Sequence, residues 1–472
     1  MRKLPLFLSA ALLLAGTARM QADQVTLTTG VPVGQNLTLG LNADLKVTLQ
    51  WGNGATQDIT SDGSLISVPV LDAGLTISST IGNITALYVQ GNKLSALDVT
   101  QAPRLKQLLC ADNELSTVDL SKCTQLEQVD VQGNQLSSLS ASASNSMNDM
   151  NVAANKLKSL PLSSSARLKW LVANDNALSS LPSSTIMKEA ETVWASNNAL
   201  STATLSSSSN LKSVVLENNK LTRISLTEAP ALTDVWVDHN ELTTLDLSKG
   251  SPVLYALSAA HNKLTSVLWD TDSKKTCAYA YLNDNALFIN SMPSLSTTAH
   301  PITTALEPQS AFEITDSHWK TGEYIDLADF VSKNGWGVTN SPTVTFTDRN
   351  GYVLKSGTDF SKTGQKYKFS KEFAAVTMTV TSNKYPNMTF TTKPFNIGDI
   401  TGIHAVTDGA AQDGRVLTSR GSLQWQGEHA SRVRIFNAAG MQVVDATVQP
   451  GNHTWQLPTG VYVVNGKKVV VP

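Results

Sequence analysis

Apolar residues recur through the middle of the chain at a nearly constant period. Each period contains an asparagine that is followed two positions later by a leucine, and successive asparagines lie 21 to 23 positions apart. Around Asn113 the apolar positions include Leu108, Cys110 and Leu115, and the alternation just before the asparagine predicts a short strand with one buried face. The ten asparagines are Asn92, Asn113, Asn134, Asn155, Asn176, Asn198, Asn219, Asn240, Asn262 and Asn285.

The asparagine is expected to turn the chain after each strand, because its side chain can bond to backbone groups that the bend leaves unpaired. One period cannot bury its apolar face alone, whereas stacked periods share a continuous core. The pattern therefore predicts a curved solenoid with a parallel sheet on its concave side. So short a period leaves no room for a full helix on the return, and residues 118–121 and 245–248 predict short extended segments there.

These repeats resemble the leucine-rich-repeat family, whose motif is L-x-x-L-x-L-x-x-N-x-L. Their length is similar to that of the short, internalin-like bacterial class. The resemblance covers residues 85–297. It implies the solenoid fold but not the ligand, because function resides in the exposed residues of such a fold.

The flanking segments lack this period, and they predict a mainly β chain. Arg2 and Lys3 precede a short apolar run, which is typical of a secretory signal peptide cleaved after Ala18 or Ala22. No later apolar run is long enough to span a membrane. The expected parts are the signal peptide (1–22), an N-terminal β cap (23–84), the leucine-rich repeats (85–297), an immunoglobulin-like β-sandwich (298–400) and a small C-terminal β-sandwich (401–472).

Turn motifs support the two predicted modules that adjoin the repeats. In the cap, residues 44–49 alternate before a W-G-x-G turn at residues 51–54, which resembles N-terminal segments of leucine-rich-repeat proteins from Bacteroidota. In the sandwich, alternating residues 343–347 precede an Asn350-Gly351 pair, which is typical of a hairpin turn.

The C-terminal segment, residues 401–472, resembles the C-terminal sorting domain of the type IX secretion system. The matching features are the turn at residues 437–440, the L-P-x-G-V-Y line at 457–462 and the terminal K-V-V-V at 468–471, although an extra Pro472 follows. The resemblance implies delivery across the outer membrane by that machinery and removal of the tail. It also implies a surface or extracellular location, with a covalent link to lipopolysaccharide in the anchored form.

Composition and motifs exclude several classes of function. Only 16% of residues are charged and the formal net charge is -2, whereas nucleic-acid-binding proteins carry a basic stripe. Three cysteines do not form a disulfide framework, and Cys110 occupies a core position. His239 and His261 each precede a repeat asparagine without a third ligand, so no metal site is expected. No catalytic or phosphate-binding motif occurs, and we expect neither an enzyme nor a cofactor.

Positions six, four, two and one before each repeat asparagine are expected to face the concave side. These forty positions hold eight acids, six aromatics and no Lys or Arg, although Lys106, Lys169 and Lys212 lie one position further out and would offset some of the charge. We interpret this face as a binding surface for a protein or glycan. Its candidate residues are Tyr88, Asp112, Asp130, Asp149, Trp170, Asp175, Trp194, Glu217, Asp234, Trp236, Asp238, Tyr279, Tyr281 and Asp284.

Other interpretations of this face stay open. The aromatics could stiffen the sheet through cross-strand contacts, and the acids could serve solubility. The leading functional hypothesis is an adhesin for host or bacterial partners, with roles in attachment and biofilm formation. The alternatives are a glycan-capture module for a nutrient-uptake system and a passive coat protein.

Overall fold

The computed structural model describes most of the chain from Ala22 onward and divides it at Ser310 into two compact units. Residues 1–21 of the predicted signal peptide lie outside the described residues. The described ranges are 22–43, 46–79, 83–141, 143–163, 166–206, 208–248, 254–269, 277–288, 303–314, 319–328, 342–382, 385–398, 415–419, 421–427, 429–438, 440–465 and 467–471.

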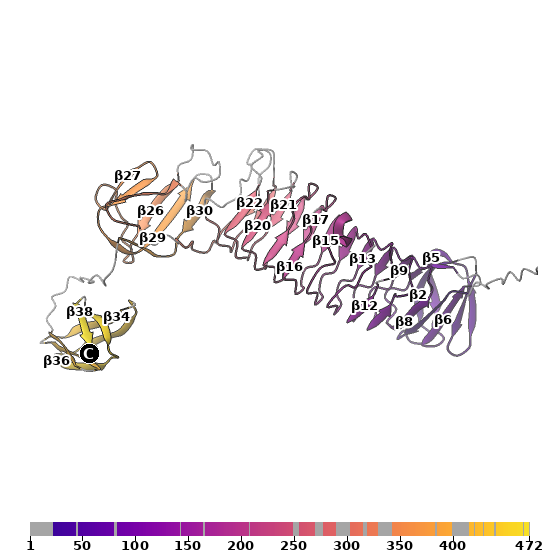
Figure 1. Cartoon of the computed structure of the whole chain (residues 1–472). Coiled ribbons are helices and arrows are strands. Elements are labelled where there is room, and N and C mark those ends of the chain that lie inside the picture. The colour runs from indigo at the N-terminus through magenta and orange to yellow at the C-terminus, as the bar shows by residue number, and fades with distance from the viewer. Residues whose placement is uncertain are drawn as a thin grey trace, which may run out of the picture. The chain divides into compact units, whose positions relative to one another are not determined.

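A thirteen-stranded sheet is the main element of the first unit, and eleven of its strands are parallel and follow one another in chain order (Figure 1). Neighbouring strands pair in register, so that Leu108 faces Leu87 on one side and Val129 on the other. This is the predicted leucine-rich-repeat solenoid. The parallel strands are β7 (Ile84–Tyr88), β9 (Gln107–Leu109), β11 (Gln128–Asp130), β13 (Asp149–Asn151), β14 (Trp170–Val172), β15 (Thr192–Trp194), β17 (Ser213–Val215), β19 (Asp234–Trp236), β21 (Ala256–Ser258), β23 (Tyr279–Tyr281) and β24 (Thr303–Ala305).

In the described residues, the chain returns between these strands through short extended segments, as predicted, and between β14 and β15 it includes a 3-10 helix, η1 (Ile186–Glu189). Among the described residues, six return segments form strands that pair in parallel two at a time. They are β10 (Thr117–Asp119), β12 (Ser138–Ser140), β16 (Thr202–Thr204), β18 (Arg223–Ser225), β20 (Thr244–Leu247) and β22 (Ser266–Trp269).

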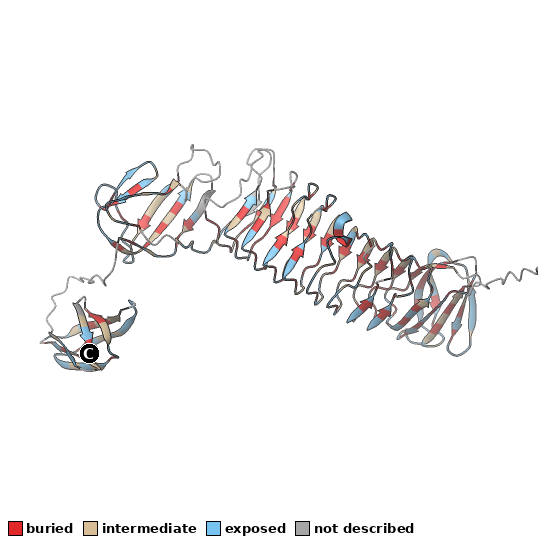
Figure 2. Cartoon of the chain, viewed as in Figure 1, coloured by how far each residue is buried: buried red, intermediate tan, exposed pale blue. Residues whose placement is uncertain are grey.

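The core of the solenoid is built from the same position of every turn. In β14 the central Leu171 is fully buried, whereas Trp170 is 41% exposed and Val172 is half-buried. The side chains of a strand alternate between its two faces, so each strand contributes one residue to the core and two to the opposite face. Figure 2 shows these buried positions in the repeat strands. Stacking of identical positions confirms that the repeats share one core.

The repeat asparagines bond to the backbone rather than to one another. The Asn219 Nδ2 donates to the carbonyls of Leu216 and Glu217 in its own turn, and to that of Ala195 in the preceding turn, at 3.0 to 3.2 Å. Its Oδ1 accepts a 3.0 Å bond from the backbone N–H of Leu200 in the preceding turn. One amide therefore fulfils the hydrogen-bonding needs of the bend and ties two turns together.

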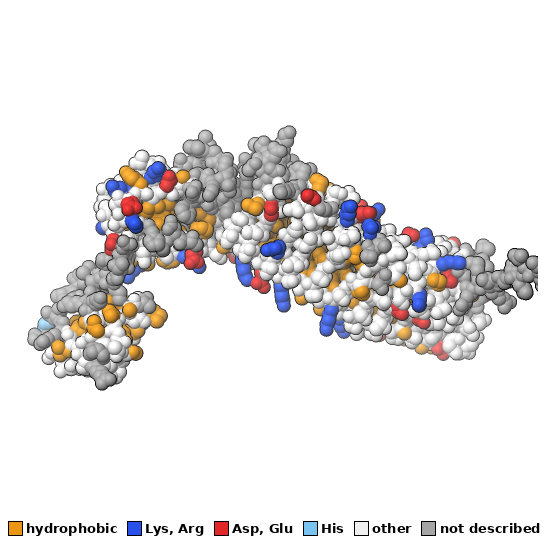
Figure 3. All heavy atoms as spheres, viewed as in Figure 1, with side chains coloured by type: hydrophobic (Ala, Val, Ile, Leu, Met, Phe, Trp, Pro, Cys, Tyr) orange, Lys and Arg blue, Asp and Glu red, His pale blue; other side chains and the backbone are white. Residues whose placement is uncertain are grey.

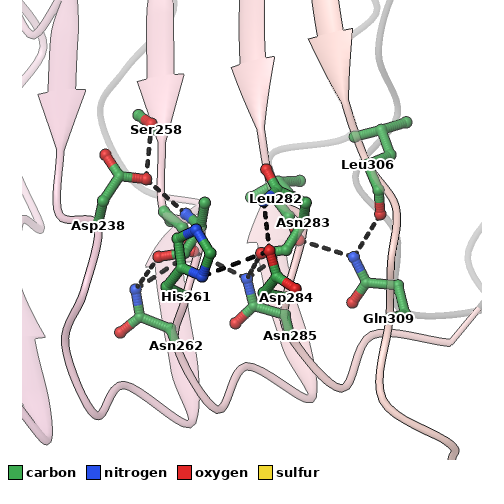
Figure 4. Close-up of polar contacts among 12 residues, drawn as sticks. Asp238, Ser258, His261, Asn262, Leu282, Asn283, Asp284, Asn285, Leu306 and Gln309 are labelled. Atoms are coloured by element: carbon green, nitrogen blue, oxygen red, sulfur yellow. Dashed lines mark hydrogen bonds and ion pairs between the residues drawn. The ribbon is translucent and has the colours of Figure 1, made fainter.

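An eleventh turn follows the last Asn-x-Leu repeat, so the solenoid sheet continues past residue 297. Gln309 takes the place of the asparagine: its Nε2 donates to the carbonyls of Leu282 and Leu306 (Figure 4). Its Oε1 accepts from the N–H of Leu287. A glutamine side chain supplies the same amide group. The sequence motif missed this turn because Gln309 and Ala311 stand where it requires asparagine and leucine.

The N-terminal cap continues the solenoid at its other end. β2 (Asn36–Ala43) pairs antiparallel with β7, and β5 (Asp62–Pro69) completes the long sheet. Asn92 exchanges two hydrogen bonds with the backbone of Thr38 in β2, in place of a preceding repeat. The second sheet of the cap contains β4 (Thr56–Ile59), β3 (Val47–Trp51), β6 (Gly74–Ser79), β1 (Gln24–Thr29) and β8 (Leu94–Gln101), in that order.

In the second unit, residues 311–398 contain two small antiparallel sheets and an aromatic core. Trp319, Phe346 and Phe369 are buried, and their ring centroids lie 5.1 to 6.3 Å apart. The Asn350-Gly351 pair forms the predicted turn, in which Gly351 has a φ of 80°. One sheet contains β25 (Tyr324–Asp326), β28 (Lys366–Phe369) and β27 (Phe360–Thr363), and the other contains β26 (Thr343–Thr347), β29 (Phe373–Ser382), β30 (Tyr385–Thr391) and β31 (Phe395–Ile397).

The C-terminal residues 415–471 form two further antiparallel sheets around a cluster that includes the buried Trp425 and Ile435. The Tyr462 hydroxyl donates to the carbonyl of Pro458 at 2.9 Å, so a hydrogen bond joins the two ends of the L-P-x-G-V-Y segment. In the described residues no helix is long and apolar enough to cross a membrane. The strands are β32 (Arg415–Ser419), β33 (Ser422–Gly427) and β36 (Gly451–Gln456) in one sheet, and β35 (Gln442–Val448), β34 (Ser431–Asn437), β37 (Gly460–Val464) and β38 (Lys467–Val471) in the other.

Candidate functional site

The outward side of the long sheet, which we call the open face, carries the candidate residues. It corresponds to the predicted concave side. Thirteen of the fourteen candidates are exposed or half-buried there, and Asp238 alone is buried, at 8% exposed. Asp238 Oδ1 accepts hydrogen bonds from the Ser258 hydroxyl and the Ala260 N–H, both at 2.7 Å, so this carboxylate also ties two turns together (Figure 4).

The residue directly before each repeat asparagine has a left-handed backbone conformation. This conformation restricts which residue types are found at that position. Asp112, Asp175 and Asp284 have φ values of 54° to 56°, and His239 and His261 have 53° and 52°. Asp, Asn and His tolerate this conformation better than other residues with a Cβ, and Gly adopts it freely. The backbone therefore accounts for these identities without a ligand.

Three tryptophans form a strip across the middle of the open face, which we call the aromatic strip: Trp170 on β14, Trp194 on β15 and Trp236 on β19. Trp170 and Trp194 are 41% and 40% exposed, and Trp236 is half-buried. Val172 and Val215 flank Trp194 in the same register on β14 and β17. The strip therefore combines apolar surface on four consecutive strands of the sheet.

Hydrogen bonds hold parts of this face in place. The Trp194 Nε1 donates to the Ser213 hydroxyl on the next strand at 3.0 Å, and the Tyr88 hydroxyl donates to Gln107 Oε1 at 2.6 Å. These bonds fix one edge of each ring and leave Trp194 substantially exposed. Cross-strand stiffening thus contributes to the role of these aromatics, but it does not bury them.

A first acidic cluster, Asp112, Asp130 and Asp149, lies on the N-terminal side of the strip. Partial burial raises the pKa of Asp130 above its ordinary value, and the neighbouring charges of Asp112 and Asp149 add to the rise. Burial also raises the pKa of Asp149, which faces Trp170 across the strand pair. Both carboxylates are thus less stable in their charged form than they would be in water.

A second acidic cluster, Glu217, Asp234 and Asp238, lies around Trp236. Burial raises the pKa of Glu217, and the charge of the neighbouring Asp238 raises it further. Asp234 and Asp238 precede and follow Trp236 by two positions, and the Asp234 carboxylate accepts a 2.6 Å bond from the Thr233 hydroxyl. The second cluster therefore places an aromatic ring between carboxylates on one turn.

Lysines at the edge of the open face act mainly on acids of their own outer row, where Lys212, with a smaller contribution from Lys169, lowers the pKa of Glu191. Contrary to our expectation, Lys106 and Lys212 form no ion pair with the two acidic clusters among the described residues. Their Nζ atoms pair instead with Glu127 and Glu191 of the same outer row, at 3.1 and 2.8 Å. The two residues of each pair are one repeat apart in the sequence, so they lie at the same position of adjacent turns. In the view of Figure 3, basic side chains lie at both the upper and the lower border of the repeat block.

The C-terminal end of the face gathers aromatic and imidazole rings. The rings of His239 and His261 are stacked with centroids 4.2 Å apart, and His261 Nδ1 lies 3.3 Å from Asp284 Oδ2. Tyr255 meets Tyr279 edge to face at 5.4 Å. Tyr255 is 53% exposed and was not among the sequence candidates, because it lies one position outside the strand register that defined them.

Comparison with solved structures finds similar chains among leucine-rich-repeat proteins. The effector YopM from Yersinia pestis is 30% identical over 40% of this chain and 53% of its own, with a TM-score of 0.34, so this chain spans about half of YopM. The functional domain of InlJ from Listeria monocytogenes is 16% identical over 70% and 94%, with a TM-score of 0.32. A leucine-rich-repeat protein from Leptospira interrogans is 19% identical over 47% and 67%, with a TM-score of 0.33. No protein-family model matches the chain, and a search of curated proteins finds no match.

The cysteines occupy core positions. Cys110, Cys123 and Cys277 are buried and unpaired, and burial raises the pKa of Cys123 to about 12 and that of Cys277 to about 11. Thiols held in this state are poor nucleophiles and poor metal ligands. Across the ranges that the structure describes, no group of three or more His, Cys, Asp or Glu residues is arranged to hold a metal ion.

Proposed function

We propose that this chain is an exported, non-catalytic cell-surface protein that binds a protein partner on its open face, in attachment and biofilm formation. The aromatic strip is the observation that carries the proposal. Covering the exposed parts of Trp170 and Trp194 would remove about 100 Å² of surface from each ring, worth about 2 kcal/mol per ring. Exposed tryptophans of this kind are frequent anchors of protein interfaces.

The test is a pull-down of host matrix and bacterial surface proteins with the full chain and with a Trp170→Ala, Trp194→Ala variant. We expect the double variant to bind its partner at least about tenfold more weakly, because both anchors are lost. Tyr324→Ala is the matched control, since Tyr324 is 55% exposed but lies in the second unit. Unchanged binding by the double variant would exclude the open face as the binding surface.

A glycan array in the same experiment separates the second candidate function. Exposed indole rings beside carboxylates, such as Trp170 beside Asp149, also suit sugar rings. Selective retention of a polysaccharide, lost in the double tryptophan variant, would favour capture of glycan for a separate enzyme. If the folded full chain retained neither protein nor glycan, the result would favour a passive coat protein.

We further propose that residues 401–472 direct export through the type IX secretion machinery, with the mature protein linked to lipopolysaccharide or released. The support is the resemblance of the turn and L-P-x-G-V-Y line to that sorting domain. Deleting residues 402–472 should trap the protein in the periplasm, as measured by fractionation and surface labelling. Deleting Pro472 alone, the residue that departs from the family pattern, should leave delivery intact. Surface delivery of the long truncation would refute the proposal.

A further inference from the structure

The open face offers negative charge on both sides of an apolar centre. Asp149 on β13 and Asp234 on β19 occupy the same position of their turns, six positions before the repeat asparagine. Between them lie the exposed rings of Trp170 and Trp194. The face therefore presents the order acid, aromatic, acid along the stack of strands.

Three lysines of the repeats form ion pairs with glutamates outside these acidic clusters. Within the described part of the repeats, the ion pairs of Lys106, Lys212 and Lys263 go to Glu127, Glu191 and Glu241, which lie outside both acidic clusters. Burial and like charge raise the pKa of Asp130 and Glu217, as described above. A cationic group placed on the face would relieve this repulsion, so the clusters favour a positively charged partner.

The spacing of the two clusters fixes the size of such a partner. Four strand-to-strand steps separate β13 from β19 in the sheet. At about 4.8 Å per step the two carboxylates lie about 19 Å apart, and an extended chain covers that distance in about six residues. Two basic residues about six positions apart would reach both clusters, and the residues between them would cover the tryptophans.

We propose that the occupant of the open face is an extended polypeptide segment with Lys or Arg at two positions about six residues apart and apolar residues between them. This rests on the proposed function, because it names the partner chemistry of the same surface. The segment crosses the strands, with its basic residues at Asp149 and Asp234 and its apolar residues on Trp170 and Trp194. Charge complementarity selects the segment, and the rings supply contact area.

Titration calorimetry of the full chain with two blocked peptides tests this inference. Both peptides have the same apolar centre, and the two outer positions, separated by the same spacing, are lysine in one and glutamate in the other. We expect only the lysine peptide to bind, with a Kd below about 1 mM, and to bind more weakly as NaCl is raised. Equal binding of the two peptides, or no binding of the lysine peptide, would overturn the inference.

Two charge-matched variants locate the contact. Asp149→Asn with Asp234→Asn should weaken binding of the lysine peptide by at least about tenfold. Glu127→Gln with Glu191→Gln removes the same charge from the outer row and should change the affinity by less than about twofold. If the tryptophan variant loses partner binding but the aspartate variant keeps it, the open face is still the binding surface, but the proposal of a basic segment is refuted. If partner binding survives the tryptophan variant, the proposed function itself fails.

Discussion

Asn219→Ala is expected to lower the free energy of unfolding of the surrounding turns by about 3 kcal/mol, because the variant leaves a buried N–H without a partner. Asn219 is 8% exposed, and its Oδ1 is the acceptor for the backbone N–H of Leu200. Its Nδ2 also serves the carbonyls of Ala195 and Leu216 in two different turns. Alanine removes all of these bonds and supplies no polar group in their place.

The measurement is urea unfolding combined with hydrogen exchange, because a solenoid can open locally. Exchange protection should fall most at Leu200 and in the two turns that Asn219 joins. The control is Asn218→Gly: its neighbour Asn218 is exposed with a φ of 53°, which glycine adopts without strain. We expect the control to change stability by less than about 1 kcal/mol. A similar loss in both variants would contradict the role given to the hydrogen bonds of the Asn219 side chain.

Asp359→Ala is expected to destabilise the sandwich of residues 311–398 by about 2–3 kcal/mol. The Asp359 side chain is 0% exposed, and its Oδ2 accepts hydrogen bonds from the Tyr352 hydroxyl at 2.8 Å and the Lys355 N–H at 2.9 Å. Lys371 Nζ lies 3.0 Å from its Oδ1. The carboxylate therefore fixes the loop that leads into β27, and its removal leaves that loop without an anchor.

The pH dependence of unfolding provides a second readout for Asp359. The Lys355 N–H is the main cause that lowers the pKa of Asp359, with Lys371 and Tyr352 adding to it. Because the pKa of Asp359 is lower in the folded state than its unfolded value near 3.8, the ionised carboxylate stabilises the fold at pH values above 3.8. This stabilisation is lost as the pH falls through the pKa of the folded state. Asp359→Asn should flatten this acid limb of the stability curve.

Glu313→Gln is the matched control for Asp359. Glu313 also pairs with a lysine, at 2.8 Å from Lys393 Nζ, but its side chain is 67% exposed. Exposed ion pairs contribute little because water screens them, so we expect no measurable change in the free energy of unfolding at neutral pH. If this variant destabilised the module as much as Asp359→Ala, burial would not be the cause of the effect.

The repeat pattern determined the solenoid because every turn imposes the same local requirements. A buried centre in each strand, such as Leu108, requires an apolar residue, and each bend requires an amide such as that of Asn219. These needs recur at a fixed spacing and are visible without contacts. The eleventh turn shows the limit of this prediction, because Gln309 supplies the same amide group but neither it nor Ala311 matches the Asn-x-Leu motif.

The candidate binding residues were placed on one face by the same period, but their surroundings depended on tertiary structure. The sequence could not show that Lys106 pairs with Glu127, that Asp238 is buried against the next turn, or that Trp170 stays exposed. The first two features join residues about one repeat apart in the sequence, and all three depend on register and side-chain direction. The sequence by itself thus determined the repeat and its core, because these follow from period and backbone chemistry. Only the folded stack decided which charges remain unpaired, because pairing depends on distances between neighbouring turns.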